Sequence, residues 1–202
     1  MLAMGADKDA LDNIGRSPLM KAAEAGHLAV VNSLLNAGAD AEIFGLESES
    51  ATALHMAAKR GHIRILKAIL EHGVDVNFAK ENGWTALHSA AWGNHPCVID
   101  MLVEAGAGID PKTPDGQTPL CFTAKLVISW CKAMRALLHH GANARVRDNE
   151  GDTVLHIACR SQSHDLDTAV DLLLRAGADE AIVNIDGDTP AQTLDRSCLH
   201  RI

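Results

Sequence analysis

The sequence lacks any hydrophobic run near the roughly 20 residues that a membrane-spanning helix needs. Its start also lacks the basic and then apolar segments of a secretory signal peptide. No Gly/Ser-rich or Pro-rich stretch stands out as a flexible linker within the 202 residues. These absences argue against membrane insertion and favour one continuous intracellular domain, for which we expect a cytoplasmic location and a monomeric state.

Cysteine is sparse and irregularly placed. The five cysteines are an odd number and form no Cys-x-x-Cys pair, which argues against a disulfide framework and against a zinc site. We expect reduced thiols in the core.

The sequence also lacks a surplus of basic residues, since its formal charge is -8 at pH 7. Its Lys and Arg residues form no basic stripe of the kind that binds phosphates. A nucleic-acid partner is therefore not expected.

What the sequence does contain is an internal repeat. A Ser or Thr marker recurs at intervals of 35, 33, 33, 35 and 36 residues, at Ser17, Thr52, Thr85, Thr118, Thr153 and Thr189. A Gly marker recurs at intervals of 33, 35, 33, 35 and 36 residues, at Gly5, Gly38, Gly73, Gly106, Gly141 and Gly177. Two markers that keep step with a period near 33 residues are typical of stacked structural repeats.

Each repeat is predicted to contain two helices. In the first repeat, Ser17 can cap a helix whose first position is Pro18. Gly26-His27 marks the turn to a second helix, which Gly38 ends in the left-handed conformation. A lone helix pair buries too little apolar surface to offset the entropy of ordering it, so the repeats must stack on their neighbours.

These motifs resemble the ankyrin repeat family. The first half of that motif is matched by Ser17-Pro18-Leu19, Thr52-Ala53-Leu54-His55, Thr85-Ala86-Leu87-His88, Thr118-Pro119-Leu120, Thr153-Val154-Leu155-His156 and Thr189-Pro190, and the middle by Gly26-His27 and Gly61-His62. The match covers nearly the whole chain. The resemblance implies an all-α fold, an ankyrin-repeat α-solenoid of stacked helix-turn-helix units with hairpin-like fingers.

We expect residues 1–202 to form a single array. Its predicted parts are the remnant of a preceding repeat (1–11), repeat 1 (12–46), repeat 2 (47–79), repeat 3 (80–112), repeat 4 (113–147), repeat 5 (148–183) and a partial C-terminal repeat or cap (184–202). Either the natural protein continues upstream, or Met1 and Leu2 leave apolar surface open. The apolar run from Leu126 to Cys131 either packs against repeat five or forms an exposed patch that a partner covers.

The sequence contains eleven histidines, a residue type common in catalytic sites, but six of them occupy recurring positions of the repeat motif. The Leu-His motif places His55, His88 and His156, and the inter-helix turn places His27, His62 and His95. No P-loop, dinucleotide glycine motif, zinc-protease helix or nucleophile elbow is present. We therefore expect no enzyme activity, no cofactor, no metal and no small-molecule substrate.

The resemblance implies a concave binding surface lined by the fingers and by the ends of the first helices. The predicted partner-binding residues are Trp84, Trp92, Glu49, Lys59, Arg60, Glu81, Asn82, Asp115, Gln117, Lys125, Glu150, Asp152 and Arg160. Tryptophan is frequent among binding hot spots, so Trp84 and Trp92 are the predicted anchors, although they could equally serve only as packing cover for adjacent elements.

The charges of these positions suggest a kind of partner. The fingers are mostly acidic and the helix ends basic, so basic groups of a partner would face the fingers, and acidic or polar groups would face the helices. The predicted function is a non-catalytic protein–protein interaction scaffold or adaptor. The alternative is an ankyrin fragment of a larger signalling, channel or ubiquitin-ligase adaptor protein.

Overall fold

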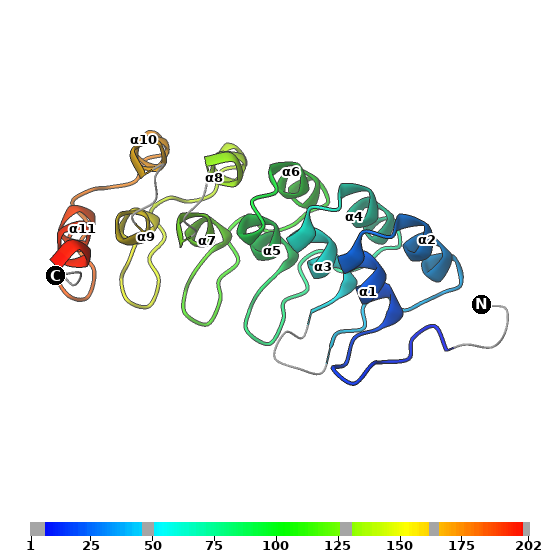
Figure 1. Ribbon diagram of the computed structural model, residues 1–202. Helices are drawn as coiled ribbons and strands as arrows, with labels where there is room; N and C mark the ends of the chain where they lie inside the picture. The colour runs from blue at the N-terminus through cyan, green and yellow to red at the C-terminus, as the bar shows by residue number, and fades with distance from the viewer. Residues whose placement is uncertain (1–6, 46–50, 126–130, 162–165, 200–202) are drawn as a thin grey trace. The chain divides into compact units, whose positions relative to one another are not determined.

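In a computed structural model, the chain forms short helices joined by turns and projecting loops (Figure 1). The structure describes residues 7–45, 51–125, 131–161 and 166–199. Over these ranges it is helical and has no strand, apart from one isolated bridge between Arg147 and Thr153. The all-α class is therefore confirmed. Glu49 and residues 126–130 of the apolar run lie outside the described ranges.

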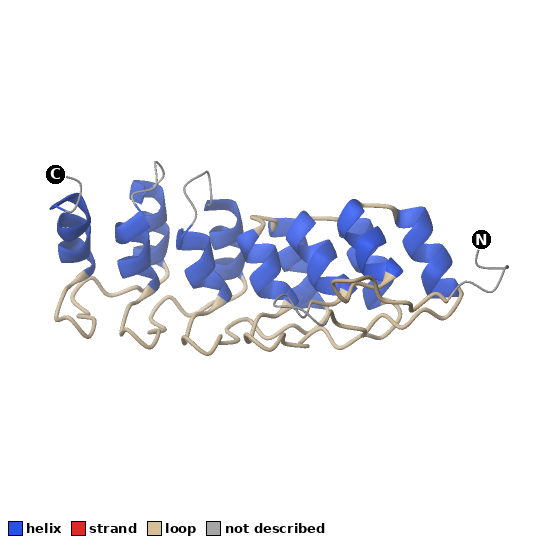
Figure 2. Ribbon diagram, turned by 60° about the horizontal axis from the view of Figure 1, so that its bottom comes forward, coloured by secondary structure: helices blue, strands red, loops and turns tan. Residues whose placement is uncertain are grey.

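The chain divides into two compact units, residues 1–107 and residues 108–202. The helices of unit 1 are α1 (Pro18–Ala25), α2 (Leu28–Asn36), α3 (Ala53–Arg60), α4 (Ile63–Leu70), α5 (Ala86–Trp92) and α6 (Pro96–Glu104). Helix α3 packs against both α1 and α5, and α4 contacts both α2 and α6. The first helices of these repeats form one layer and the second helices form another (Figure 1), and the fingers lie along one edge (Figure 2).

Unit 2 repeats the same arrangement. Its described helices are α7 (Pro119–Lys125), α8 (Cys131–His139), α9 (Val154–Ser161), α10 (Leu166–Arg175) and α11 (Pro190–Leu199). Helix α9 packs between α7 and α11, and α8 contacts α10. Helix α11 is the first helix of the predicted partial repeat. That the two units form one array over 1–202 stays a prediction.

The helices begin and end where the repeat pattern places the caps. The Ser17 hydroxyl accepts a hydrogen bond from the Met20 amide at 3.3 Å, which satisfies a free donor of the first turn of α1. Gly61 ends α3 with φ of 75°, and Asn94 takes the same left-handed place after α5 with φ of 56°. Helices of 7 to 10 residues are too short to be stable alone, so their stability comes from packing.

Small side chains bring the first helices of unit 1 close together. Ala23, Ala58 and Ala91 occupy equivalent positions in α1, α3 and α5, and all three are buried.

Cysteine fits the expected pattern only in part. Cys121 and Cys159 are buried thiols whose pKa burial raises, but Cys97 is exposed, so the prediction that the cysteines are core thiols is wrong there.

The histidines of the Leu-His motif connect one repeat to the next. In repeat five, the Thr153 amide donates to His156 Nδ1 at 3.1 Å, so the ring proton sits on Nε2, which donates to the Asp188 carbonyl at 3.0 Å. In repeat two, His55 Nε2 likewise donates to the Trp84 carbonyl at 3.1 Å. The buried rings thus satisfy backbone groups of the following repeat.

The histidines of the inter-helix turn make a second set of ties in unit 1. His62 Nε2 donates to the Glu24 carbonyl at 3.2 Å, and His95 Nε2 donates to the Lys59 carbonyl at 3.1 Å. Both bonds satisfy a carbonyl at the end of the preceding repeat's first helix. In these repeats the histidines have the structural role that their repetition predicts.

Candidate functional site

The candidate site is built from one pair of positions that recurs in each repeat. A side chain just before the first helix faces the side chain eight residues later, because two helical turns bring the chain back to the same face. The described contacts of this kind are Arg16 with Glu24 (3.4 Å), Trp84 with Trp92 (ring centroids 6.1 Å), Gln117 with Lys125 (2.6 Å) and Asp152 with Arg160 (2.6 Å). We call these positions the pair row. In repeat two, Ala51 and Lys59 occupy them.

In unit 1 the pair row contains the tryptophan pair. The rings of Trp84 and Trp92 meet edge to face at 63°, and Trp84 also stacks on the buried His88 with ring centroids 5.8 Å apart. The Lys80 ammonium lies 5.8 Å from the centre of the Trp84 ring, within reach of a cation–π interaction. Trp92 is 39% exposed. The predicted shared face of the two tryptophans is thus present, and it offers aromatic surface to solvent.

The end of α3 contributes charged side chains to the same face of unit 1. Arg60 Nη2 lies 2.7 Å from Glu24 Oε1, and this hydrogen bond lowers the pKa of the Glu24 carboxyl from its ordinary value. Arg16 contacts the other carboxylate oxygen of Glu24 at 3.4 Å. Lys59 stands at the pair-row position of repeat two. Glu24 is therefore engaged by two guanidinium groups.

The remaining predicted residues of unit 1 lie in the finger before α5. The Asn82 side-chain oxygen accepts a hydrogen bond from the Trp84 amide at 3.1 Å, so Asn82 shapes the turn that presents Trp84. Glu81 is exposed beside it. Glu49 cannot be placed, because it lies outside the described ranges.

In unit 2 the predicted residues surround an open pocket of about 370 Å³. Its lining consists of Gln117, Lys125, Asp148, Glu150, Asp152, Ile157, Arg160 and Ser161. Five of these were predicted from the sequence. Asp115, which was also predicted, is not among them: it is exposed on its finger, where its backbone carbonyl accepts a hydrogen bond from the Asn149 amide at 3.0 Å.

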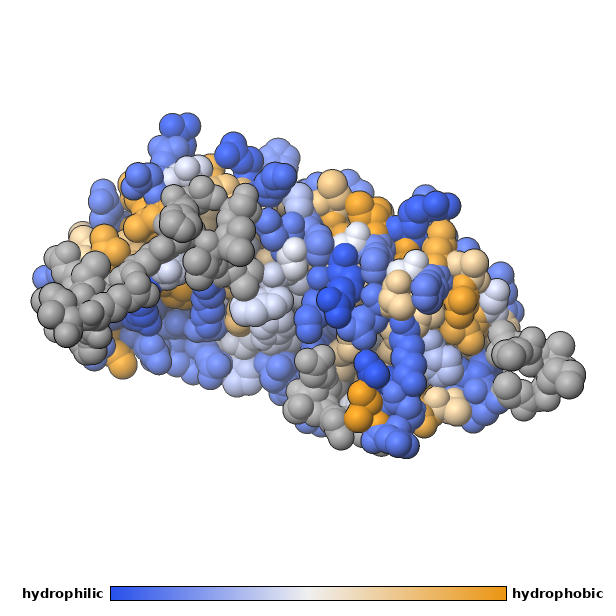
Figure 3. Space-filling view, viewed as in Figure 1, coloured by the Kyte–Doolittle hydropathy of each residue, from blue (hydrophilic) through white to orange (hydrophobic). Residues whose placement is uncertain are grey.

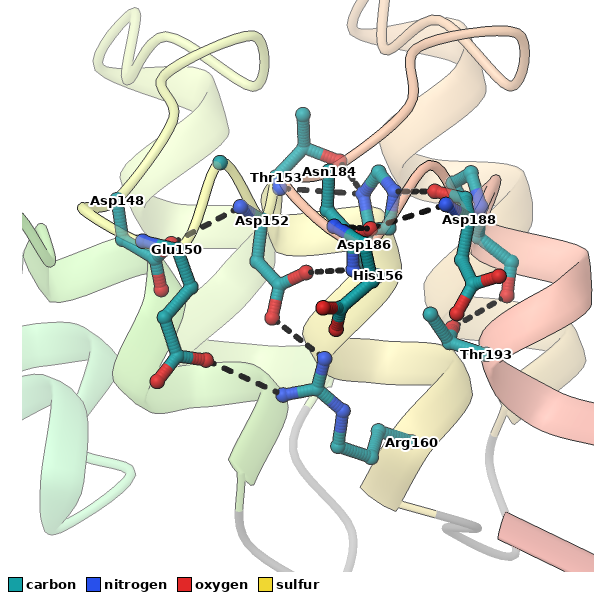
Figure 4. A network of polar contacts seen from close by, with 12 residues as sticks. Asp148, Glu150, Asp152, Thr153, His156, Arg160, Asn184, Asp186, Asp188 and Thr193 are labelled. Carbon is teal, nitrogen blue, oxygen red and sulfur yellow. Dashed lines mark hydrogen bonds and ion pairs between the residues drawn. The ribbon is translucent and has the colours of Figure 1, made fainter. Parts of the chain in front are cut away.

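Buried carboxylates organise one side of this pocket (Figure 4). Asp148 accepts hydrogen bonds from the amides of Glu150 and Asp152 at 3.0 and 2.9 Å, and from the Gln117 side chain at 3.3 Å. One oxygen of Asp152 accepts a hydrogen bond from the Asn184 side chain at 2.9 Å. The other has no hydrogen bond and is held as an ion pair by the Arg160 guanidinium, 2.6 Å away.

This arrangement pairs the acidic and basic positions that the sequence analysis assigned to a partner. Arg160 contacts Asp152 and, at 3.8 Å, Glu150, so the basic helix end and the acidic finger neutralise each other. Lys125 is likewise engaged with Gln117. Arg160 and Lys125, two of the predicted basic helix ends, are therefore each engaged by another side chain of unit 2.

Replacing Arg160 by Ala tests how much its ion pair with Asp152 stabilises the fold. The Asp152 side chain is 1% exposed and that of Arg160 is 46% exposed, so Arg160→Ala leaves a buried carboxylate without its counter-ion. We expect the free energy of unfolding to fall by about 2 kcal/mol, less than for a fully buried pair because water reaches the arginine. Urea denaturation measures this change.

Two further variants show whether the loss of stability in Arg160→Ala comes from the unpaired Asp152 carboxylate. Asp152→Asn in the Arg160→Ala background removes the unpaired charge and should recover much of the loss. Arg175→Ala breaks an ion pair with Asp171 whose side chains are 76% and 54% exposed, and should change stability by less than about 0.5 kcal/mol. A double variant less stable than Arg160→Ala would contradict the interpretation.

The structure adds residues that the sequence analysis missed. Lys80, Arg16 and Glu24 belong to the tryptophan face of unit 1, and Asp148 organises the unit 2 pocket. The sequence does contain a pattern that indicates two of these residues. Arg16 and Glu24 are eight residues apart and carry opposite charges, as Asp152 and Arg160 do.

No feature of the described residues indicates a metal site or a membrane span. In residues 7–45, 51–125, 131–161 and 166–194, no group of three or more His, Cys, Asp or Glu side chains is placed to hold a metal ion. No helix within the same ranges combines the length and the hydropathy needed to cross a membrane. On the face in Figure 3, hydrophobic residues gather in separate small groups among hydrophilic ones.

Comparisons with known proteins agree with the repeat architecture. A family model described as ankyrin repeats in three copies matches residues 41–115 and 94–184, and one described as an ankyrin repeat matches residues 14–44. Among solved structures, the ankyrin repeat domain of Bcl-3, described as a unique member of the IkappaB protein family, superposes with a TM-score of 0.78 at 28% identity, over 96% of this chain and 87% of that one. No curated protein matches the chain at a significant level.

Proposed function

The chain belongs to the ankyrin repeat family, and from this premise we propose that it is a non-catalytic scaffold that binds a partner protein on its finger and first-helix surface. Ankyrin repeats are generally protein–protein interaction modules, and the fold is typically non-catalytic. We expect the protein to act as a monomer in the cytoplasm. The observation that carries the proposal is the tryptophan pair, Trp84 and Trp92, at the end of α5 and its finger.

The tryptophan pair differs in kind from the other described members of the pair row. Arg16 with Glu24 and Asp152 with Arg160 are ion pairs, and Gln117 with Lys125 is a hydrogen bond, so each of these side chains is engaged by its pair partner. Two indole rings in contact still leave apolar surface in water, here at Trp92. A partner that covers this surface gains apolar burial.

The surroundings of the pair suit a binding hot spot. Interface hot spots are enriched in Trp and Arg and are surrounded by side chains that exclude water. Arg60 and Lys59 at the end of α3, together with Lys80 over the Trp84 ring, provide such a rim in unit 1. The charges of the rim would affect selectivity more than affinity.

Replacing both tryptophans tests the proposal. Trp84→Ala with Trp92→Ala should weaken binding of a captured protein partner by at least thirtyfold, about 2 kcal/mol, because the anchor surface is removed. The partner is captured from the source cell, identified and purified, and its dissociation constant is measured by calorimetry. The matched control is Val30→Ala with Ile63→Ala, which removes two exposed apolar side chains from the second helices α2 and α4.

Three outcomes separate binding from folding. Weakened binding with an unchanged unfolding midpoint, and a control that binds normally, supports the proposal. A large loss of stability in the double tryptophan variant assigns both rings to the fold. Normal binding by that variant, or weak binding by the control, places the interface elsewhere.

A further inference from the structure

We propose that the turn at residues 106–110, which follows α6, is a hinge built into the chain. It opens more readily than the equivalent turns of other repeats, because Gly108 stands where those turns have a side chain that closes them. The hinge does not depend on the partner proposed above. Its evidence is a hydrogen bond that recurs in the other described turns of this kind and that Gly108 cannot make.

The recurring bond closes the turn after the marker Gly of each repeat. Two residues after that Gly, the side-chain oxygen of an Asp or Asn accepts a hydrogen bond from the amide two residues further on. The described examples are Asp7 with the Asp9 amide at 3.0 Å and, each at 2.9 Å, Asp40 with Glu42, Asp75 with Asn77, Asn143 with Arg145 and Asp179 with Ala181. Such bonds hold the backbone of a turn in one conformation.

Gly108 is the exception to this pattern. It stands two residues after Gly106 and has no side chain that could accept the bond. The Asp110 amide, which occupies the donor position, has no hydrogen-bond acceptor among the described residues. The Gly108 backbone has an interaction of its own, so the weak point is the missing side-chain acceptor and not an unpaired Gly108.

The backbone conformation of this turn does not require a glycine at position 108. Gly106 has φ of 94°, in the left-handed region that favours glycine, whereas Gly108 is not in that region. Residue 108 is also exposed. An aspartate could therefore replace Gly108 without backbone strain and with its side chain at the surface.

The chain is anchored on both sides of Gly108. Before it, the Asn77 side chain donates to the Gly106 carbonyl at 3.1 Å, and both residues belong to unit 1. After it, the Asp110 carboxylate accepts a hydrogen bond from the Asn143 amide at 3.1 Å, and both belong to unit 2. A change of conformation in the turn is therefore confined to the few residues between these anchors, where the boundary of the two compact units also falls.

Amide exchange of the full-length chain, followed residue by residue by NMR, measures how readily each turn opens. The informative amide is that of Ala107, because in the closed turn it is bonded as its counterparts Ala39 and Ala142 are. These bonds run from Ala107 to the Leu102 carbonyl at 2.9 Å, from Ala39 to Leu34 at 2.9 Å and from Ala142 to Leu137 at 3.0 Å. We expect the ratio of intrinsic to observed exchange rate to be about tenfold lower for Ala107 than for the other two.

Three variants assign the cause of this difference. Gly108→Asp supplies the missing acceptor and should slow exchange of the Ala107 amide about tenfold. The matched control, Gly108→Ala, restricts the backbone without adding an acceptor and should slow it by no more than about threefold. The reciprocal variant, Asp40→Gly, removes the acceptor from an equivalent turn of unit 1 and should speed exchange of the Ala39 amide about tenfold.

Two results would overturn the hinge. One is an Ala107 amide as well protected in the unmodified chain as those of Ala39 and Ala142. The other is equal slowing of Ala107 exchange by Gly108→Asp and Gly108→Ala, because the missing acceptor would then not be the cause. Neither measurement involves a partner, so neither result bears on the tryptophan pair.

Discussion

Replacing His156 by Ala should lower the free energy of unfolding by about 4 kcal/mol. The ring is fully buried, and its two nitrogens bond the Thr153 amide at 3.1 Å and the Asp188 carbonyl at 3.0 Å. Its removal leaves both backbone groups without a partner and opens a cavity beneath α11, each of which costs on the order of 1 to 3 kcal/mol. Urea denaturation followed by circular dichroism measures the loss.

A second histidine of unit 2 provides the control for this variant. His139 is exposed near the end of α8, so His139→Ala should change stability by less than about 0.5 kcal/mol. Equal effects of the two substitutions would show that His156 does not join repeat five to the helix that follows it.

Acid should destabilise the protein through His55, which is buried in repeat two. Burial, reinforced by the positive charge of Lys80, lowers the pKa of His55 from 6.5 to about 4. Because the folded-state pKa lies below the unfolded-state value, the unfolded chain takes up the proton first. Stability is therefore complete above about pH 6.5, falls as the pH is lowered, and has lost about 3 kcal/mol from this group near pH 4.

The variant His55→Gln isolates this contribution. A glutamine amide can donate to the Trp84 carbonyl in place of Nε2 and has no proton to take up. Free energies of unfolding measured from pH 7 to pH 4 should fall more steeply for the unmodified chain, by up to about 1.4 kcal/mol per pH unit. Carboxylates such as Glu24 titrate in both proteins, so parallel curves would contradict the role assigned to His55.

Most of the fold could be predicted because its determinants repeat. The Ser17 and Thr85 positions, the Gly61 turn and the Leu-His motif recur with the period of the structure, and each has a local physical role that one sequence reveals. The tie from His156 to Asp188 could not be placed in this way. Which carbonyl a buried ring meets depends on how adjacent repeats pack, and spacing along the chain does not specify that.

The sequence indicated both tryptophans and most of the charged residues of the candidate site, but not how those charges pair with one another. Trp84 lies two residues before α5 and Trp92 is the last residue of that helix, so helix geometry brings the two rings to the same face. Arg160 has a long side chain that can point either toward a partner or back to Asp152. It points to Asp152 because that carboxylate is buried and needs a counter-ion, and the sequence does not reveal the burial. Asp148 was missed because its importance lies in bonds to the amides of its own turn.

Hydrogen–deuterium exchange on the chain with and without its captured partner tests most directly the central claim, that a protein binds at the tryptophan pair. Binding should slow exchange of the finger amides at 80–85 and of the turn amides at 92–95, and should leave the amides of α2 and α4 unchanged. Protection confined to α2, α4 and α6, with the finger and turn unaffected, would contradict the claim.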